Sequence, residues 1–132
     1  MHKVADDLNI KFDTIGIREA VSRCHGNAVS AGWWHDIHTG EPLDRNKGEL
    51  LMFMVSEIAE AMEGVRKGKM DDHLPHRKSE EVELADVLIR IFDYAGAYGL
   101  DLAGAYEEKL LYNQSRKDHK PENRRKEGGK AF

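Results

Sequence analysis

The sequence lacks the features on which several classes of protein depend. A single cysteine, Cys24, excludes an intrachain disulfide and is typical of a reducing compartment. Every longer apolar stretch is soon interrupted by an acidic or basic residue, so none could span a bilayer. The first ten residues lack the basic start and apolar core of a secretory signal. We therefore expect a cytoplasmic protein with no membrane partner.

Polar–apolar alternation, heptads and internal repeats are also missing, which leaves helical periodicity as the organising pattern. The 132 residues are enough for one domain with a core of its own. Asp13 or Thr14, Ser79 and Asp101 are suited to cap helices. The predicted fold class is therefore all-α. The four expected helices cover about residues 14–30, 46–67, 79–98 and 102–116.

The net charge of −4 is unevenly distributed along the chain. From Arg116 onward there are seven basic and three acidic residues, a balance of +4, so the rest of the chain carries −8. An acidic body does not favour a protein that coats duplex nucleic acid, and no stable nucleic-acid partner is expected. The chain is accordingly divided into an N-terminal extension, a helical domain and a basic C-terminal tail or lid, over residues 1–12, 13–117 and 118–132.

Two pairs of acids lie on the second and third predicted helices. Glu57 and Glu60 form one pair, and Glu83 and Asp86 form the other. Acids three positions apart emerge from one face of a helix. Four carboxylates brought together would need protons or hard cations such as Mg²⁺ between them. The pattern thus suits a metal site, although a solvated helix face is the ordinary explanation of either pair alone.

The surroundings of the second pair weigh against that ordinary explanation. Apolar residues fill most of the circumference of the third predicted helix. Its charged residues, which also include Arg90 and Asp93, are confined to one narrow stripe. A helix that is apolar around so wide an arc is mostly buried, so the stripe indicates either a polar seam toward water or a site that faces another helix.

The fourth predicted helix carries polar and basic residues on one face. Lys109, Asn113 and Arg116 recur there at spacings of four and three. Such a face is ordinarily solvated, but beside a metal–carboxylate cluster it would suit phosphate oxygens. Lys130, which follows two glycines in the tail, is a further candidate for phosphate contact, against the alternative of a disordered and solubilising tail.

Taken in order, these motifs resemble those of the MazG-like family of all-α nucleoside triphosphate pyrophosphohydrolases. The family pattern is Glu-x-x-Glu on one helix, Glu-x-x-Asp on the next, and a Lys with an Asn four residues later on the helix after that. The stretch 83–89 is especially similar to the family's second motif, and the ending resembles shorter, often phage-encoded members. The resemblance covers about residues 14–130.

The resemblance implies that Glu57, Glu60, Glu83 and Asp86 hold Mg²⁺, or in some members Mn²⁺, and are the catalytic residues. It implies hydrolysis of a (deoxy)nucleoside triphosphate, for example a purine nucleotide such as (d)GTP, to the monophosphate and pyrophosphate. Water would attack the α-phosphorus. It further implies a four-helix bundle that assembles as a homodimer or homotetramer, in the host cytoplasm if a phage encodes the protein.

One position departs from the family pattern. Ser56 stands where many members carry a further Glu immediately before the first pair. Water activation, or one metal position, would then be arranged differently in this chain. Glu49 and Glu63 are candidate substitutes for the missing carboxylate.

Aromatic residues mark the long connector between the first two predicted helices. Trp33 and Trp34 are followed there by His35. Either one Trp packs the end of the first helix onto the core, or these side chains stack on the base or contact the sugar of the substrate. Aromatic and His residues near the base pocket in relatives support the second interpretation.

Two further functions stay open at this point. One is a non-catalytic helical interaction module that binds a protein or nucleic acid partner. The other is a phosphatase or pyrophosphatase that acts on a different diphosphate. Metal-dependent turnover separates the hydrolases from the interaction module, and the identity of the products separates the two kinds of hydrolase from each other.

Overall fold

The computed structural model describes residues 15–132, so Asp13, Thr14 and the extension 1–12 lie outside the described residues. The described chain is mostly helical and has two isolated β-bridges but no strand, which confirms the all-α prediction. It forms two compact units, which meet in sequence between Leu100 and Asp101. None of the described helices combines the length and hydropathy that a bilayer crossing requires.

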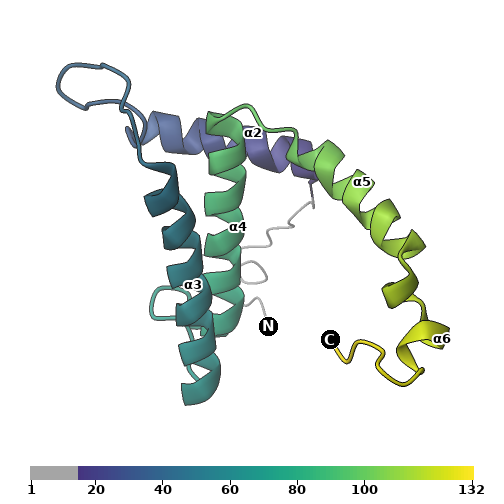
Figure 1. The fold of residues 1–132 in the computed structure, drawn as a ribbon. Coiled ribbons are helices and arrows are strands. Elements are labelled where there is room, and N and C mark those ends of the chain that lie inside the picture. The colour runs from purple at the N-terminus through teal and green to yellow at the C-terminus, as the bar shows by residue number, and fades with distance from the viewer. Residues whose placement is uncertain (1–14) are drawn as a thin grey trace. The chain divides into compact units, whose positions relative to one another are not determined.

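Helix α3 (Lys47–Lys67) begins and ends where the sequence places its boundaries (Figure 1). The Asn46 side chain accepts a hydrogen bond from the backbone N–H of Glu49 at 2.9 Å. This bond satisfies one of the free donors in the first turn. At the other end Gly68 has a φ of 57°, the left-handed conformation in which helices commonly stop at glycine.

Helix α4 (Ser79–Ala97) lies alongside α3 and is connected to it by residues 68–78 (Figure 1). The sequence predicts Ser79 as the N-cap, but the cap is Lys78, whose backbone N–H donates to the Glu81 carboxylate at 3.2 Å. Ser79 is instead the first helical residue and is buried. A Cβ added at Gly64 of α3 would lie 2.8 Å from the Ser79 side chain. Packing against α3 therefore takes the place of capping at this serine.

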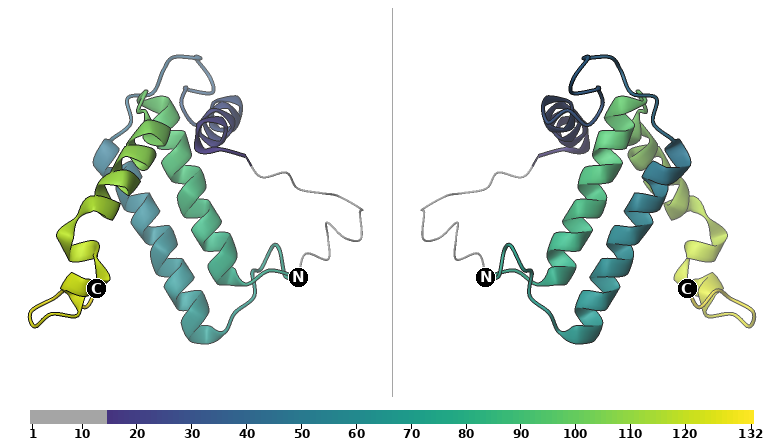
Figure 2. Two further views of the ribbon diagram at one scale, coloured as in Figure 1. Left: turned by 90° about the vertical axis from the view of Figure 1, so that its right-hand side faces the viewer. Right: turned by 90° about the vertical axis from the view of Figure 1, so that its left-hand side faces the viewer.

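Helix α2 (Ile17–Ser30) contacts α4 but crosses it steeply, as two turned views also show (Figure 2). The two helices approach each other closely at Gly96 of α4. A Cβ added there would lie 2.5 Å from the Cβ of His25 on α2. Only a residue without a side chain allows the two backbones to come this close.

The core of the unit that α2, α3 and α4 form is small. Its buried apolar residues, among those described, are Ala20, Leu50, Ala61, Val87 and Ala95. Many larger apolar side chains stay exposed on α3 and α4. They include Leu51, Met52, Val55, Ile58, Met62, Val65, Leu84, Leu88 and Ile89. Exposed apolar surface of this extent commonly marks a contact with another chain.

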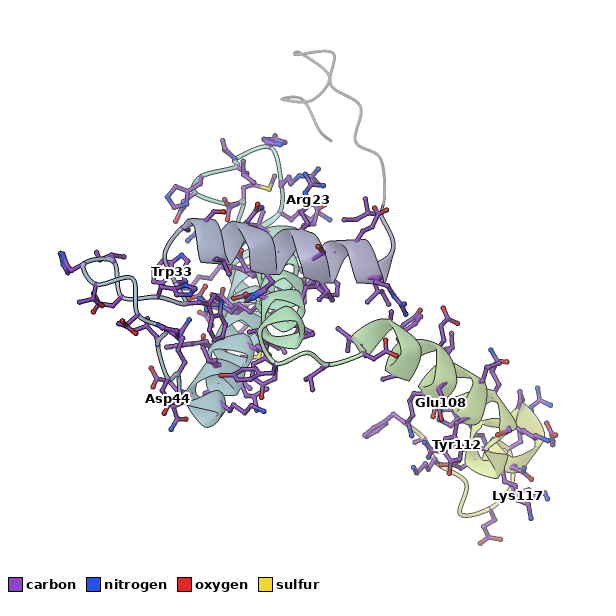
Figure 3. The ribbon with its side chains drawn as sticks, turned by 90° about the horizontal axis from the view of Figure 1, so that it is seen from above. Arg23, Trp33, Asp44, Glu108, Tyr112 and Lys117 are labelled. Atoms are coloured by element: carbon purple, nitrogen blue, oxygen red, sulfur yellow. The ribbon has the colours of Figure 1, made fainter. Side chains whose placement is uncertain are left out.

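The C-terminal unit begins with α5 (Leu102–Ser115). Asp101 caps this helix as predicted, because its carboxylate accepts a hydrogen bond from the N–H of Gly104 at 3.0 Å. Glu108 and Tyr112 extend from α5, as Figure 3 shows. The expected four-helix bundle requires α5 to pack onto the three preceding helices, and that packing stays a prediction.

The basic tail contains two short helical segments, a 3₁₀ turn (Lys117–His119) and α6 (Pro121–Arg124). The Arg124 guanidinium donates hydrogen bonds to the backbone carbonyls of Lys130 and Ala131 at 3.1 and 2.6 Å. These bonds fold the end of the chain back onto α6, so the tail has a structure of its own within the C-terminal unit.

Replacing Gly96 with Ala should destabilise the unit formed by α2, α3 and α4. The added methyl group must push His25 away, and overpacking of this kind typically costs about 1–3 kcal/mol, partly offset by the higher helix propensity of Ala, about 1 kcal/mol. Chemical denaturation followed by circular dichroism measures the change in the free energy of unfolding. Gly26→Ala on α2 is the matched control, because a Cβ there meets nothing within 4 Å, and it should be neutral or stabilising. Equal effects of the two substitutions would contradict the close helix crossing.

Candidate metal centre and adjoining cleft

Three of the four predicted acids converge where α3 faces α4. Each of Glu57, Glu60 and Glu83 offers a carboxylate oxygen that lies within 4.8 Å of the other two. The spacing of three places Glu57 and Glu60 on one side of α3, and the antiparallel neighbour α4 brings Glu83 to them. Glu57 and Glu83 are half-buried, whereas Glu60 is exposed. We call these three residues the acid cluster.

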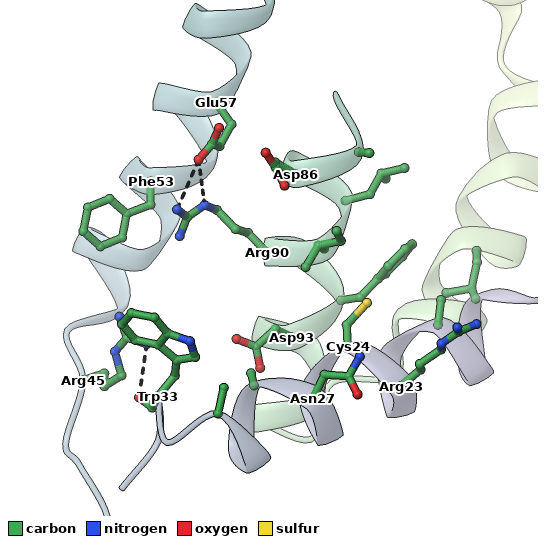
Figure 4. A pocket seen from close by; sticks show the side chains of 18 of the residues that line it. Arg23, Cys24, Asn27, Trp33, Arg45, Phe53, Glu57, Asp86, Arg90 and Asp93 are labelled. Atoms are coloured by element: carbon green, nitrogen blue, oxygen red, sulfur yellow. Dashed lines mark hydrogen bonds and ion pairs between the residues drawn. The ribbon is translucent and has the colours of Figure 1, made fainter. Parts of the chain in front are cut away.

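Asp86 lies one turn further along α4 and does not belong to the group of three that could share an ion. It lines the adjoining cleft with Glu57, and Figure 4 shows the two carboxylates near each other. Burial raises the pKa of Asp86 above its ordinary value, and the negative charge of Glu57 raises it further. Arg90 acts in the opposite direction. Asp86 is therefore a neighbour of the acid cluster rather than a member of it.

The charges in the acid cluster are not balanced by protein groups alone. Burial, hydrogen bonding to Glu57 and Glu60, and the charges of those residues raise the pKa of Glu83 to about 8. At neutral pH the Glu83 carboxyl thus retains a proton that an ordinary glutamate would release. This proton removes one negative charge and allows Glu83 to hydrogen-bond with its neighbours. It therefore reduces the repulsion among the carboxylates, as a bound cation would.

The donor set suits a hard divalent ion. All the converging ligand atoms are carboxylate oxygens, which Mg²⁺ and Mn²⁺ prefer over other side-chain donors. Two oxygens bound to one Mg²⁺ lie about 3–4 Å apart, given metal–oxygen distances of about 2.1 Å. The oxygens of the acid cluster lie within 4.8 Å of one another, so small rotations of the side chains would be enough for three of them to reach one ion.

Arg90 supplies the one positive charge that directly contacts the acid cluster among the described ion pairs. Its Nε and Nη2 both donate to Oε1 of Glu57, at 3.2 and 3.1 Å. The guanidinium also lies over the ring of Phe53, 5.3 Å from the ring centroid (Figure 4). Sequence reasoning placed Arg90 in the charged stripe of its helix but gave it no role, because its partner lies 33 residues away on another helix.

An open cleft of about 1170 Å³ adjoins the acid cluster and is lined by residues of α2, α3, α4 and the connector after α2. Glu57, Asp86 and Arg90 form one part of its wall. The remaining walls are largely apolar but carry several polar groups. The polar groups are those of Arg23, Asn27, Trp33, Arg45, Glu49 and Asp93. The combination of apolar walls and a few polar groups is typical of a small-molecule site.

The two tryptophans of the connector have different environments. Trp33 lines the cleft and is 64% exposed, at the C-terminal end of α2 (Figure 3). Trp34 is half-buried, and its indole N–H donates to the Asp93 carboxylate at 2.9 Å. His35 pairs with Pro42 in an isolated β-bridge of the connector. Trp34 therefore packs the connector onto α4, while Trp33 is the residue of the three that faces the cleft.

Asp93 binds together three parts of the chain that sequence reasoning did not connect. It accepts hydrogen bonds from Trp34 and from Nδ1 of His25, the latter at 2.9 Å. The His25 and Tyr98 rings both contact the Trp34 indole edge to face. The position of Asp93 in the charged stripe of α4 was the available signal, but its partners could be found only from the tertiary structure.

The predicted phosphate-binding residues all belong to the C-terminal unit. The Arg116 guanidinium donates to the Asn113 amide oxygen at 3.4 Å and is paired with Asp118. Lys130 also pairs with Asp118, at 3.0 Å, and these two cations hold the pKa of the Asp118 carboxyl well below its usual range. Lys109 lies over the ring of Tyr112. The structure thus groups Asn113, Arg116 and Lys130, and their contact with phosphate stays a prediction.

The position that departs from the family pattern holds a side chain turned toward its own helix. The Ser56 hydroxyl donates to the backbone carbonyl of Phe53 at 2.7 Å and is exposed. Of the two candidate substitutes, Glu63 is paired with Arg66 and Lys67 on α3, whereas Glu49 lines the cleft. Glu49 is accordingly the better placed of the two.

No family model, curated protein or solved structure matches this chain.

The raised pKa of Glu83 predicts that the metal-free protein loses stability as the pH rises. Glu83 is protonated in both states below about pH 4.5, but between 4.5 and about 8 only the folded protein retains the proton. The free energy of unfolding must then fall across this interval. Thermal unfolding in a chelating buffer from pH 5 to 8.5 measures the fall. Glu83→Gln should flatten the profile and Glu63→Gln should not, and an unchanged slope in Glu83→Gln would contradict the assignment.

Proposed function

We propose that the protein is a divalent-metal-dependent nucleoside triphosphate pyrophosphohydrolase of the MazG-like type. The convergence of Glu57, Glu60 and Glu83 at the edge of a cleft large enough for a nucleotide carries this proposal. It is supported by the order of the sequence motifs, in which the same acids precede Lys109 and Asn113. The substrate is a (deoxy)nucleoside triphosphate, and the products are its monophosphate and pyrophosphate.

In this proposal Glu57, Glu60 and Glu83 hold Mg²⁺ or Mn²⁺, with Asp86 beside them. The bound ion supplies charge neutralisation for the phosphates and lowers the pKa of the attacking water. Asp86 is suited to take a proton from that water, because its raised pKa gives it more affinity for protons than an ordinary aspartate has. This reaction would separate the α and β phosphates by attack at the α-phosphorus.

The cleft provides groups for the remainder of the nucleotide. The exposed indole of Trp33 offers a flat surface for a base, and Arg45 lies in the same wall, its guanidinium 3.5 Å from the Trp33 carbonyl. Arg23 and Asn27 of α2 offer further hydrogen-bond donors. A cleft of about 1170 Å³ has room for a purine such as guanine, and the carboxylate of Glu49 in its wall would be an acceptor for the N–H groups of that base.

We further propose that the active form is a homodimer or homotetramer in which four-helix bundles associate. The exposed apolar side chains of α3 and α4 support association, since burying them would complete a core that is small in a single chain. Helix α5 would complete each bundle. The same assembly would place Lys109, Asn113 and Arg116 as phosphate contacts, with Lys130 from the tail.

Purified protein with Mg²⁺ should convert at least one member of a panel of canonical and modified NTPs and dNTPs to the monophosphate and pyrophosphate, identified by chromatography. Glu60→Gln should lower turnover more than about 100-fold, because even groups that only support metal ligands contribute up to that much. The matched control is Glu63→Gln, one turn along the same helix, where the side chain pairs with Arg66 and Lys67. This control should retain wild-type turnover.

The products decide among the alternatives. Release of orthophosphate with a diphosphate would identify an ordinary phosphatase. Absence of metal-dependent turnover with every nucleotide, together with binding of protein or nucleic acid that weakens with salt, would identify an interaction module. Undiminished turnover by Glu60→Gln, with the helical signal intact, would remove the acid cluster from the reaction.

The proposed assembly predicts a molecular mass in solution of two or four times 15.0 kDa at micromolar concentration. Analytical ultracentrifugation measures this mass. Replacing an exposed apolar residue of α3, as in Met62→Lys, should shift the equilibrium toward the monomer because it places a charge in a buried contact. A monomeric mass for the wild-type chain would contradict the proposal.

A further inference from the structure

Arg90 lies on the same stripe of α4 as Glu83 and Asp86, seven and four residues after them. Its guanidinium reaches across to α3 and places two N–H groups on Oε1 of Glu57. Glu57 keeps only 13% of its side-chain exposure, whereas Arg90 keeps 43%. The carboxylate is thus fixed in the wall between the helices, and the cation that covers it is accessible from the cleft.

The ion pair between Arg90 and Glu57 neutralises a negative charge that a divalent ion would also neutralise. Glu57 and its neighbours Glu60 and Glu83 bring up to three negative charges together. The guanidinium retains its charge at all ordinary pH values, so it neutralises Glu57 whenever no other cation does. A divalent ion at the acid cluster would repel a guanidinium a few ångströms away and would compete with it for the same carboxylate.

The geometry also determines where the guanidinium can go once it leaves Glu57. Arg90 lines the cleft, and the ring of Phe53 lies beneath its guanidinium and stays beside the cleft (Figure 4). Arg45 and Trp33 are in the wall of the same cleft. A guanidinium turned into this space presents a planar pair of donors to an anion, and phosphate accepts such a pair in bidentate fashion.

We propose that Arg90 is an exchangeable counter-cation: it neutralises Glu57 in the metal-free protein, and a divalent ion displaces it toward the phosphate chain of a ligand in the cleft. The second half of this statement rests on the proposed function, since it requires a polyphosphate ligand. The first half requires only that the acid cluster binds a divalent ion. Metal binding and phosphate binding are thereby coupled through one side chain.

The test compares Arg90→Gln with wild type by isothermal titration calorimetry, using Mn²⁺ alone and then inorganic tripolyphosphate in the presence of saturating Mn²⁺. Loss of the competing cation should tighten Mn²⁺ binding, by roughly threefold to tenfold. Loss of the phosphate contact should weaken tripolyphosphate binding by about tenfold or more. In both titrations Arg90→Lys should have an affinity between those of wild type and Arg90→Gln, because it keeps the charge but not the planar donors.

Arg66→Gln is the matched control. Arg66 also pairs with a glutamate of α3, at 2.9 Å from Glu63, but on the exposed side of the helix rather than in the cleft. It should change neither titration. Circular dichroism of each variant shows that the helices are retained.

Equal Mn²⁺ affinity in wild type and Arg90→Gln would overturn the proposal, and so would a weaker Mn²⁺ affinity, which indicates that Arg90 only supports the local structure. Unchanged tripolyphosphate binding would overturn the second half. These results are independent of turnover. If the wild-type protein is active but Arg90→Gln leaves the Mn²⁺ affinity unchanged, the exchange alone is disproved. If Arg90→Gln binds Mn²⁺ more tightly but the wild-type protein has no activity, the proposed function alone is disproved.

Discussion

The repulsion among carboxylates at the seam between α3 and α4 is the constraint on which the rest of the site depends. Glu57, Glu60 and Glu83 are held within 4.8 Å by the packing of two helices whose backbones approach closely at Gly64 and Ser79. The helices fix the backbone positions of the acids, and Glu57 and Glu83 are half-buried, so these two carboxylates have little room to separate. In the described structure the repulsion is reduced by a proton on Glu83 and by the ion pair between Glu57 and Arg90.

Helix α3 contributes residues to two different surfaces. One side carries Glu57 and Glu60, and other positions of the same helix expose Met52, Val55 and Met62. The buried core is small, so the position of α3 depends on relatively few intrachain apolar contacts. Any contact that covers these apolar residues would therefore also restrict the acids. Any such association would therefore be physically linked to the geometry of the acid cluster through a single helix.

The sequence was sufficient for those parts of the fold that depend on local interactions. Asn46, Gly68 and Asp101 bound their helices as expected, because capping bonds and left-handed glycines involve neighbours within a few residues. The prediction was wrong at Ser79, which packs against Gly64 instead of capping its helix. A close contact between distant segments overrode the local preference there.

The same distinction applies to the candidate site. The spacing of the acids predicted that Glu57, Glu60, Glu83 and Asp86 would all meet, since helical periodicity determines which residues share a face, and the structure brings the first three of them together. It could not show that Asp86 lies beside the group, or that Arg90 covers Glu57. Nor could it separate Trp33 from Trp34, whose environments differ because only one of them reaches Asp93. The positions of Asp86 and Arg90 depend on how α3 packs against α4, whereas the difference between the two tryptophans depends on the crossing of α2 over α4 and on the path of the connector.

The anchoring of Trp34 by Asp93 has a consequence for its neighbour. With one indole fixed between His25 and Tyr98, the backbone of the connector is restrained at the position next to Trp33. The backbone that carries Trp33 is thus held in place, while its ring is 64% exposed in the wall of the cleft. A flat molecule that stacks on this ring would have to fix the side-chain torsions of Trp33 but not its backbone, so less conformational entropy would be lost than in a mobile loop.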